Sequence, residues 1–388
     1  MQLQHLHHRR LRPGRRRQRA DLHHHRRPIV AGKWFTADGA PVPQQGGEQG
    51  RPSSRPDSGA AAAPRPGAGV VPQDGGTITS HNQHLTLLGL GLWGRCLRQL
   101  IERNGHSVQG WSRSLGGDPV DALRDADLVV SAVSMAGVPQ LAARLAEPLG
   151  RGLPLISCSK GIAPGSLATA LMLWRQHCPT LRGLVLSGPN LSVELSKGLP
   201  AATVLAGEDG ALGEELQKAL SSDQLRIYRN DDPIGTEVAA ALKNVMAIAA
   251  GVSDGLSLGA NAKASLLCRG LAEMASVIEV MGGQPETLFG LAGLGDLLAT
   301  ANSPLSRNYR FGLAMGQGAS AAEALARCES TVEGCATTRA VTELASCHGF
   351  PVPIARQVLE LMEQRNTPAG AVKALMERDL QVEQHLPA

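Results

Sequence analysis

A Gly-x-Gly-x-x-Gly turn between a strand and a helix constrains the fold of this chain more than any other feature. The apolar run Leu85–Leu88 leads into the turn, and a helical pattern follows it as far as Arg103. Gly89 permits the tight turn, Gly91 lets the backbone approach a pyrophosphate, and Gly94 lets the helix pack closely on the strand. The motif alone is weak in a chain with 45 glycines. The prediction of a dinucleotide site at the helix N-terminus therefore depends on the strand before the motif and the helix after it.

Seven short apolar runs, each bounded by turn residues, give the pattern of an α/β sheet. They are Leu85–Leu88, Val108–Trp111, Leu128–Val133, Leu155–Ser157, Leu184–Leu186, Thr203–Ala206 and Leu225–Tyr228. Helix-like segments separate several of them, which favours a mostly parallel, doubly wound sheet of Rossmann type. Beyond Asn230 the strand signals stop, and long helical patterns begin at Asp232 and Pro233, an N-cap and first-turn pair. We expect a dinucleotide-binding domain over residues 81–231 and an all-α substrate domain over residues 232–388.

Residues 1–80 differ from the rest of the chain in charge and composition. They hold 13 Lys+Arg against 5 Asp+Glu, whereas the remaining residues hold 25 against 29. The mildly acidic body does not favour nucleic-acid binding. Three interpretations of this segment stay open: a disordered basic arm, an arm for nucleic acid, membrane surface or organelle targeting, and translated sequence upstream of the true start. Half of the twelve histidines lie here, and no metal site is expected from them.

Length and cysteine usage narrow the class of protein. A chain of 388 residues has room for two domains and a large core. Its seven cysteines are odd in number and form no CxxC pair, which is typical of reduced thiols in a cytoplasmic protein. No apolar run approaches the roughly 20 residues of a membrane-spanning helix, and no secretory signal follows the early arginines. We expect a soluble cytoplasmic protein.

The end of the second predicted strand bears on cofactor choice. An NAD-specific site usually places an acidic residue here to bind the ribose 2′-hydroxyl, but none occurs before Asp118. Ser112 and Arg113 offer a hydroxyl and a guanidinium, which suit a 2′-phosphate. The sequence therefore favours NADPH, with NADH as an open alternative and a solvated surface role for Arg113 as the other interpretation.

Two lysines are candidates for chemistry. Lys243 is the one charge in the fifteen-residue apolar stretch Val238–Val252, which predicts a helix buried all round. Burial lowers the pKa of an unpaired ammonium, although a lone lysine often extends to water instead. Lys160, in Ser-Lys-Gly after a strand, lies at the end of the sheet where ligands bind, or is a plain surface lysine.

Further downstream, glycine-rich and arginine-containing segments suggest a phosphate site. Gly293–Leu297 includes Asp296, and Ser306–Arg310 includes Arg307 and Asn308. Free backbone N–H groups in such turns and an arginine fork both match phosphate oxygens. Asp296 as a helix cap and Arg307 as a surface charge are the alternative interpretations.

Taken in order, these motifs resemble those of the bacterial-type NAD(P)-dependent glycerol-3-phosphate dehydrogenase family. The matching stretches, which span residues 84 to about 365, are Gly89–Gly94, Trp111–Arg113, Ser157–Gly161, Ser187–Asn190, Gly198–Pro200, Asn230–Asp232, Leu242–Asn244, Asn261–Lys263, Arg269–Met274, Gly293–Leu297, Ser306–Asn308 and Val332–Gly334. The resemblance implies reversible hydride transfer between NADPH, or NADH, and C2 of dihydroxyacetone phosphate. The product, sn-glycerol 3-phosphate, serves phospholipid synthesis.

The resemblance also implies roles for individual residues. Lys243 would be the general acid/base, Asp296 would hold it, and Lys160 would contact cofactor and substrate while lowering the pKa of Lys243. The implied substrate contacts are Lys160, Gly188, Asn190, Lys243, Asn244, Asp296, Ser306, Arg307 and Asn308. The implied cofactor contacts are Gly89, Gly91, Leu92, Trp93, Gly94, Ser112, Arg113, Lys160, Ser192, Arg307, Val332 and Glu333. A homodimer is one assembly open to such a protein.

The sequence departs from the family pattern at several points. The loop between Arg113 and Asp125 is shorter than the family's, so part of the Rossmann wall is missing or replaced. Small or acidic family residues are replaced by Leu92, Asn190, Ser192 and Ala260. Two other functions stay open: another two-domain NADP-dependent reductase of ketopantoate or 3-hydroxyacid type, and a non-catalytic NADP-binding protein with a nucleic-acid-binding arm.

Overall fold

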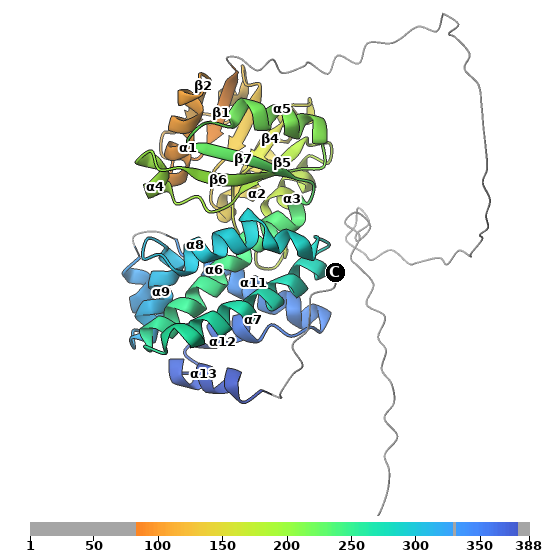
Figure 1. Cartoon of the computed structure of the whole chain (residues 1–388). Coiled ribbons are helices and arrows are strands. Elements are labelled where there is room, and N and C mark those ends of the chain that lie inside the picture. Colours follow the sequence, from red (N-terminus) through yellow and green to blue (C-terminus); the bar gives the residue numbers. More distant parts are fainter. Residues whose placement is uncertain (1–82, 329–330, 379–388) are drawn as a thin grey trace, which may run out of the picture.

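The computed structural model describes residues 83–328 and 331–378 and contains a sheet-based region followed by a helical region (Figure 1). The arm expected at residues 1–80 lies outside the described residues. The strands are β1 His84–Leu88, β2 Ser107–Trp111, β3 Leu128–Ser131, β4 Leu155–Ser157, β5 Gly183–Ser187, β6 Ala201–Ala206 and β7 Leu225–Asn230. The helices among them are α1 Leu92–Arg103, η1 Asp121–Leu123, η2 Met135–Gly137, α2 Val138–Gly150, α3 Ala170–His177, α4 Ser192–Ser196 and α5 Gly210–Leu220.

All seven predicted strands are present in one sheet, in the order β2-β1-β3-β4-β5-β6-β7. Every neighbouring pair is parallel except β5 and β6. Alternate residues of the strands face opposite sides: Leu85 and Leu87 pack in the cluster containing α1 and α5, whereas Leu88 packs with α2 and α3. Both faces are thus covered, as a mostly parallel sheet requires. The predicted Rossmann-type fold class is confirmed.

The sheet ends at β2, on the adenosine side of the expected cofactor site. In the usual Rossmann order, 3-2-1-4-5-6, a third strand lies beyond the second. Here β2 is only half-buried, and the described chain from Ser112 to Asp127 contains one short 3-10 helix, η1, and no strand. This geometry agrees with the short loop after Arg113.

The helical region is built around α6, Pro233–Gly255. Around it lie α7 Gly259–Val280, η3 Pro285–Phe289, η4 Leu291–Gly295, α8 Asp296–Ala301, α9 Arg307–Gly316, α10 Ala321–Ala326, α11 Glu333–His348, α12 Pro353–Met362 and α13 Pro368–Met376. As predicted, Asp232 caps α6, its carboxylate accepting from the Gly235 N–H at 2.8 Å, and Pro233 is the first helical residue. No helix in the described part of the chain is long and apolar enough to cross a membrane.

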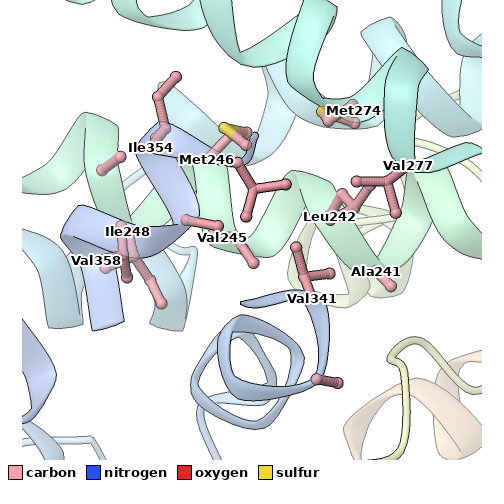
Figure 2. Packing of buried hydrophobic residues seen from close by; sticks show 14 of the residues in the cluster. Ala241, Leu242, Val245, Met246, Ile248, Met274, Val277, Val341, Ile354 and Val358 are labelled. Carbon is pink, nitrogen blue, oxygen red and sulfur yellow. The ribbon is translucent and has the colours of Figure 1, made fainter. Parts of the chain in front are cut away.

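Helix α6 is buried on all sides because its side chains are small or apolar. Figure 2 shows Leu242, Val245 and Met246 of α6 packed among residues of α7, α11 and α12. Glycines bring α9 into backbone contact with α6: a Cβ on Gly312 would lie 1.9 Å from the Ile248 carbonyl oxygen. This close approach sets the start of α9 beside the middle of α6.

Candidate active site

The glycine turn after β1 has the geometry that a pyrophosphate needs. Gly89 has φ +95°, and a Cβ on Gly94 would lie 1.8 Å from the Gly89 carbonyl oxygen. A Cβ on Gly91 would meet nothing within 4 Å, so open space lies in front of the α1 N-terminus, which has no side-chain cap. The free N–H groups there can bind an anion. Leu92, which replaces a small residue, is 68% exposed at this turn, and Trp93 lies beside the Cys158 thiol.

The two residues expected to read the 2′-phosphate follow β2. Ser112 is hydrogen bonded to the Ser114 hydroxyl at 3.0 Å, and Arg113 is exposed. The nearest acidic residue, Asp118, is bound by Arg144 through two hydrogen bonds of 2.7 and 3.1 Å. Its carboxylate is therefore engaged away from Arg113, and the turn keeps the cationic character that the sequence indicates.

The structure brings Lys160, Lys243 and Asp296 together, although they come from distant parts of the chain. Lys160 Nζ donates to one carboxylate oxygen of Asp296 at 2.7 Å, and Lys243 Nζ donates to the other at 3.1 Å. Lys160 also donates to the Gly188 carbonyl at 3.3 Å. Asp296 is 2% exposed and Lys243 is 7% exposed. One buried carboxylate thus forms salt bridges with two ammonium groups.

This charge arrangement shifts the pKa values of the cluster. Burial lowers the pKa of Lys243; Asp296 opposes the shift, and the Lys160 ammonium adds to it. Burial alone would raise the pKa of Asp296, but the two ammonium groups outweigh burial and hold it below its usual range. Asp296 therefore stays ionised, and Lys243 can release a proton more readily than an ordinary lysine.

Local structure explains why these three side chains point to one place. Lys243 projects from the middle of α6, and Lys160 follows β4 at the carboxyl end of the sheet. Asp296 begins α8 directly after η4, a π-helical turn in which a Cβ on Gly293 would lie 2.1 Å from the Leu288 carbonyl oxygen. Only glycine fits there without moving the turn that delivers Asp296.

A second group of polar residues extends from Asn244, the neighbour of Lys243. Asn308 donates from Nδ2 to Asn244 Oδ1 at 2.8 Å and accepts at Oδ1 from the Gly334 N–H at 2.9 Å. Asn244 Nδ2 also reaches a Glu333 carboxylate oxygen at 3.5 Å. The N-termini of α9 and α11 therefore meet over α6, and Arg307 opens the first turn of α9.

The remaining predicted residues, Asn190, Ser306, Ser192 and Val332, have the following places in the structure. Asn190 Nδ2 donates to the Thr203 hydroxyl at 2.9 Å, and Ser306 caps α9 by accepting from the Tyr309 N–H at 3.2 Å. Ser192 begins α4, and Val332, 3% exposed, is the N-cap residue of α11.

Thr300 was missed by the sequence reasoning. Its hydroxyl lies 2.8 Å from Lys243 Nζ and 3.2 Å from the Asp296 carboxylate. It follows Asp296 by four residues, so both side chains share one face of α8. That spacing is the only sequence signal for Thr300, and it means nothing until Asp296 is assigned. In the described part of the chain, no group of three or more His, Cys, Asp or Glu side chains is arranged to hold a metal ion.

Comparisons with known proteins agree on one family. The family model described as the NAD-dependent glycerol-3-phosphate dehydrogenase C-terminus matches residues 232–373, and the N-terminal model matches residues 114–212. A glycerol-3-phosphate dehydrogenase [NAD(P)+] of a Synechococcus species is 50% identical over 297 residues, covering 76% of this chain and 98% of the relative. The enzyme of the same name from Acaryochloris marina is 47% identical over 300 residues, covering 77% and 97%.

A solved structure agrees with these relatives. The crystal structure of glycerol-3-phosphate dehydrogenase from Coxiella burnetii has a TM-score of 0.73 and 33% identity, covering 76% of this chain and 99% of that one. The likeness therefore spans both the sheet-based and the helical regions described above.

Proposed function

The chain belongs to the NAD(P)-dependent glycerol-3-phosphate dehydrogenase family, and from this premise we propose how its residues perform the reaction. The enzyme reduces dihydroxyacetone phosphate to sn-glycerol 3-phosphate, reversibly, and the product supplies phospholipid synthesis. The observation that carries the assignment of residues is the buried cluster of Lys160, Lys243 and Asp296 at the carboxyl end of the sheet.

Lys243 is the general acid in the direction of reduction. Bound NAD(P)H supplies the hydride that reaches C2 of the substrate. The carbonyl oxygen then gains negative charge, and Lys243 transfers a proton to it, leaving a neutral amine. In the reverse direction the neutral amine accepts the hydroxyl proton. A pKa lowered by burial and by Lys160 suits both directions, while ionised Asp296 and the Thr300 hydroxyl hold the amine in place.

The substrate phosphate is held where the N-termini of α9 and α11 meet. Arg307 provides a charged fork, and Asn244 and Asn308 provide amide groups that are already oriented by the hydrogen bond between them. Lys160 follows β4 at the carboxyl end of the sheet and binds Asp296, and we propose that it contacts both substrate and cofactor. Gly188, Asn190 and Ser306 complete the substrate contacts that we propose.

The cofactor lies over the carboxyl ends of the strands. Its pyrophosphate binds at the N-terminus of α1, where Gly89, Gly91 and Gly94 shape the turn beside Leu92 and Trp93. Arg113 and Ser112 bind the 2′-phosphate of NADPH, which is why we propose NADPH as the preferred form. The nicotinamide side is contacted by Lys160, Ser192, Arg307, Val332 and Glu333.

Initial rates of NADPH and NADH oxidation test the proposal directly. We expect oxidation with dihydroxyacetone phosphate, and none with ketopantoate or a 3-oxoacid, because these carry a carboxylate in place of the phosphate. Oxidation with ketopantoate alone would overturn the substrate assignment. Binding of NADPH with no turnover of any of these carbonyl compounds would overturn the assignment as an enzyme. A domain boundary near residue 231, a homodimer and a cytoplasmic location stay predictions.

A further inference from the structure

Glu237 is a buried carboxylate on the catalytic helix that no step of the reaction uses. It lies on α6, six residues before Lys243, and is 3% exposed. Burial raises its pKa to about 7, against the opposing effects of the Thr169 hydroxyl, the Leu171 N–H and Arg175. A carboxylate in this position costs free energy unless its contacts compensate, so its contacts indicate what it does.

The main contact of Glu237 is with the other domain. Its Oε1 accepts from the backbone N–H of Leu171 at 2.9 Å. Leu171 is the second residue of α3, a helix whose own N-cap residue, Thr169, makes no capping hydrogen bond to it. Helix N-termini leave N–H groups without intrahelical partners and favour negative charge. Glu237 therefore supplies, from the helical domain, the cap that α3 of the Rossmann domain lacks.

The chain that joins α3 to the active site is the Lys160 segment, residues 160–169. Although it follows strand β4 and its Ala163 and Ala168 pack with α2 and α3, the segment also packs on the helical domain. Ile162, 1% exposed, belongs to the core around α6, and Leu167 packs against the same core. In addition, the Gly165 N–H lies 3.3 Å from a carboxylate oxygen of Glu343 on α11. One end of the segment carries Lys160, bound to Asp296, and the other end reaches Glu237 through Leu171.

We infer that Glu237 is a positioning residue, which fastens the far end of the Lys160 segment to α6 and so fixes Lys160 relative to Lys243. The inference rests on the roles proposed above for the two lysines. Both lysines must reach the two oxygens of one carboxylate, although they stand on different domains. The hydrogen bond between Glu237 on α6 and Leu171, just beyond the end of this segment, keeps the distance between the two lysines constant. Glu237 itself touches neither substrate nor cofactor in this account.

A matched control exists in the same domain. Glu273 on α7 is also buried, 6% exposed, and burial raises its pKa to about 7. It caps α12 by accepting from the N–H groups of Ile354 and Ala355 at 2.8 and 2.9 Å. Both ends of this contact lie in the helical domain, away from Lys160. Glu273→Ala therefore removes an equivalent buried cap without releasing the Lys160 segment.

The test compares Glu237→Ala with Glu273→Ala. Displacing a catalytic group by about 1 Å can cost on the order of 100-fold in rate, so we expect Glu237→Ala to lower kcat roughly 10- to 100-fold with dihydroxyacetone phosphate. We also expect it to shift the apparent pKa of the pH–rate profile, because Lys160 and Asp296 set the pKa of Lys243. Glu273→Ala should lower the melting temperature while leaving kcat within about threefold and that apparent pKa unchanged. Equal effects of the two variants on kcat and apparent pKa would overturn the inference.

If Glu237→Ala does not fold, two conservative variants distinguish the effect of the side chain's length from the effect of its charge. Glu237→Gln keeps the length and a carbonyl oxygen for the Leu171 N–H, so kcat should stay within about threefold. Glu237→Asp keeps the charge but is shorter by about 1.5 Å, so its kcat should fall well below that of Glu237→Gln. The opposite order would show that charge, not position, matters, and would overturn the inference.

Hydrogen exchange of the backbone provides a readout that does not depend on turnover. Glu237→Ala should speed exchange across residues 160–169, whereas Glu273→Ala should speed it across residues 353–362. Unchanged exchange over residues 160–169 would overturn the positioning role even if the enzyme is active. Inactivity of the wild type with dihydroxyacetone phosphate would instead overturn the proposed function, and the exchange result would still stand.

Discussion

Two lysine–aspartate pairs each have one member on α6, Lys243 in one and Asp254 in the other. These two residues are about three helical turns apart, and the pairs differ in what surrounds them. Lys243 and Asp296 share their contact with a second cation, Lys160, and are almost fully buried. In the other pair, Asp254 of α6 binds Lys263 at 2.6 Å, with side chains 27% and 15% exposed.

In the second pair, the additional partner of the carboxylate is the neutral hydroxyl of Tyr309 and not a second cation. The Tyr309 hydroxyl donates to Asp254 at 2.7 Å, and Lys263 Nζ lies 5.1 Å from the centre of the Tyr309 ring. One cation therefore meets one carboxylate, whereas at the first pair two cations meet one. Burial lowers the pKa of Lys243, and the Lys160 cation adds to this shift while Asp296 opposes it. Deep burial and a second cation therefore distinguish the pair to which we assign proton transfer from the pair to which we do not.

Removing the cation at the first pair should have the largest effect. Lys243→Met replaces the lysine by an apolar side chain of similar length in a buried helix, so the fold should persist. General acid–base groups contribute about 10²- to 10⁴-fold in rate, and kcat for reduction of dihydroxyacetone phosphate should fall by that factor. Circular dichroism would check the fold. A variant with most of its kcat would remove Lys243 from the mechanism.

Arg307→Ala should have the next largest effect, because it acts on substrate binding and not on proton transfer. A lost charge-assisted hydrogen bond is worth about 1.5–3 kcal/mol. The KM for dihydroxyacetone phosphate should therefore rise roughly 10- to 150-fold, while the weak reaction with unphosphorylated dihydroxyacetone should hardly change. Similar losses with both substrates would place Arg307 away from the phosphate.

Arg113→Ala tests a cation that is exposed to solvent, whereas the lysines of the two pairs are buried or partly buried. Its contact with the 2′-phosphate is partly screened, so we expect the KM for NADPH to rise by about 10-fold. The KM for NADH should change by less than about twofold, since NADH has no 2′-phosphate. Equal weakening of both cofactors would show that Arg113 does not distinguish them.

Lys263→Met should have the smallest effect on the reaction, which is the sharpest test of the comparison. Partly exposed pairs contribute about 0.2–1 kcal/mol to stability, so the melting temperature should fall by a few degrees at most. We expect kcat to stay within about threefold of the wild type, because no proton moves through this pair. A loss of kcat as large as that of Lys243→Met would end the distinction between the two pairs.

Local patterns made the fold predictable from the sequence. The seven strands and the buried helix α6 follow from periodicity, and the Asp232 cap follows from a pair of neighbouring residues. The glycine turn was equally clear from a six-residue motif, in which Gly89 has φ +95° and Gly94 packs against the Gly89 carbonyl.

Contacts between distant segments were not predictable in the same way. The family resemblance implied that Asp296 holds Lys243 with Lys160 nearby, but no pattern of residues indicates that the two lysines bind opposite oxygens of that carboxylate. Nor does any pattern indicate that Glu237 caps α3 across 66 residues. Thr300 had no signal apart from its spacing from Asp296. Within residues 83–328 and 331–378 no strand lies beyond β2, and the sequence showed this only as a short loop, since sheet order depends on tertiary pairing.

The pH dependence of kcat in the wild type and in Lys160→Met tests the central claim most directly. Because protonated Lys243 donates the proton, kcat for reduction should fall as pH rises through its pKa, with a midpoint below the ordinary value of 10.5. Removing the Lys160 cation should move that midpoint upward, whatever it does to the maximal rate. A midpoint that stays where it is in Lys160→Met, or one that is already at 10.5 in the wild type, would contradict the account.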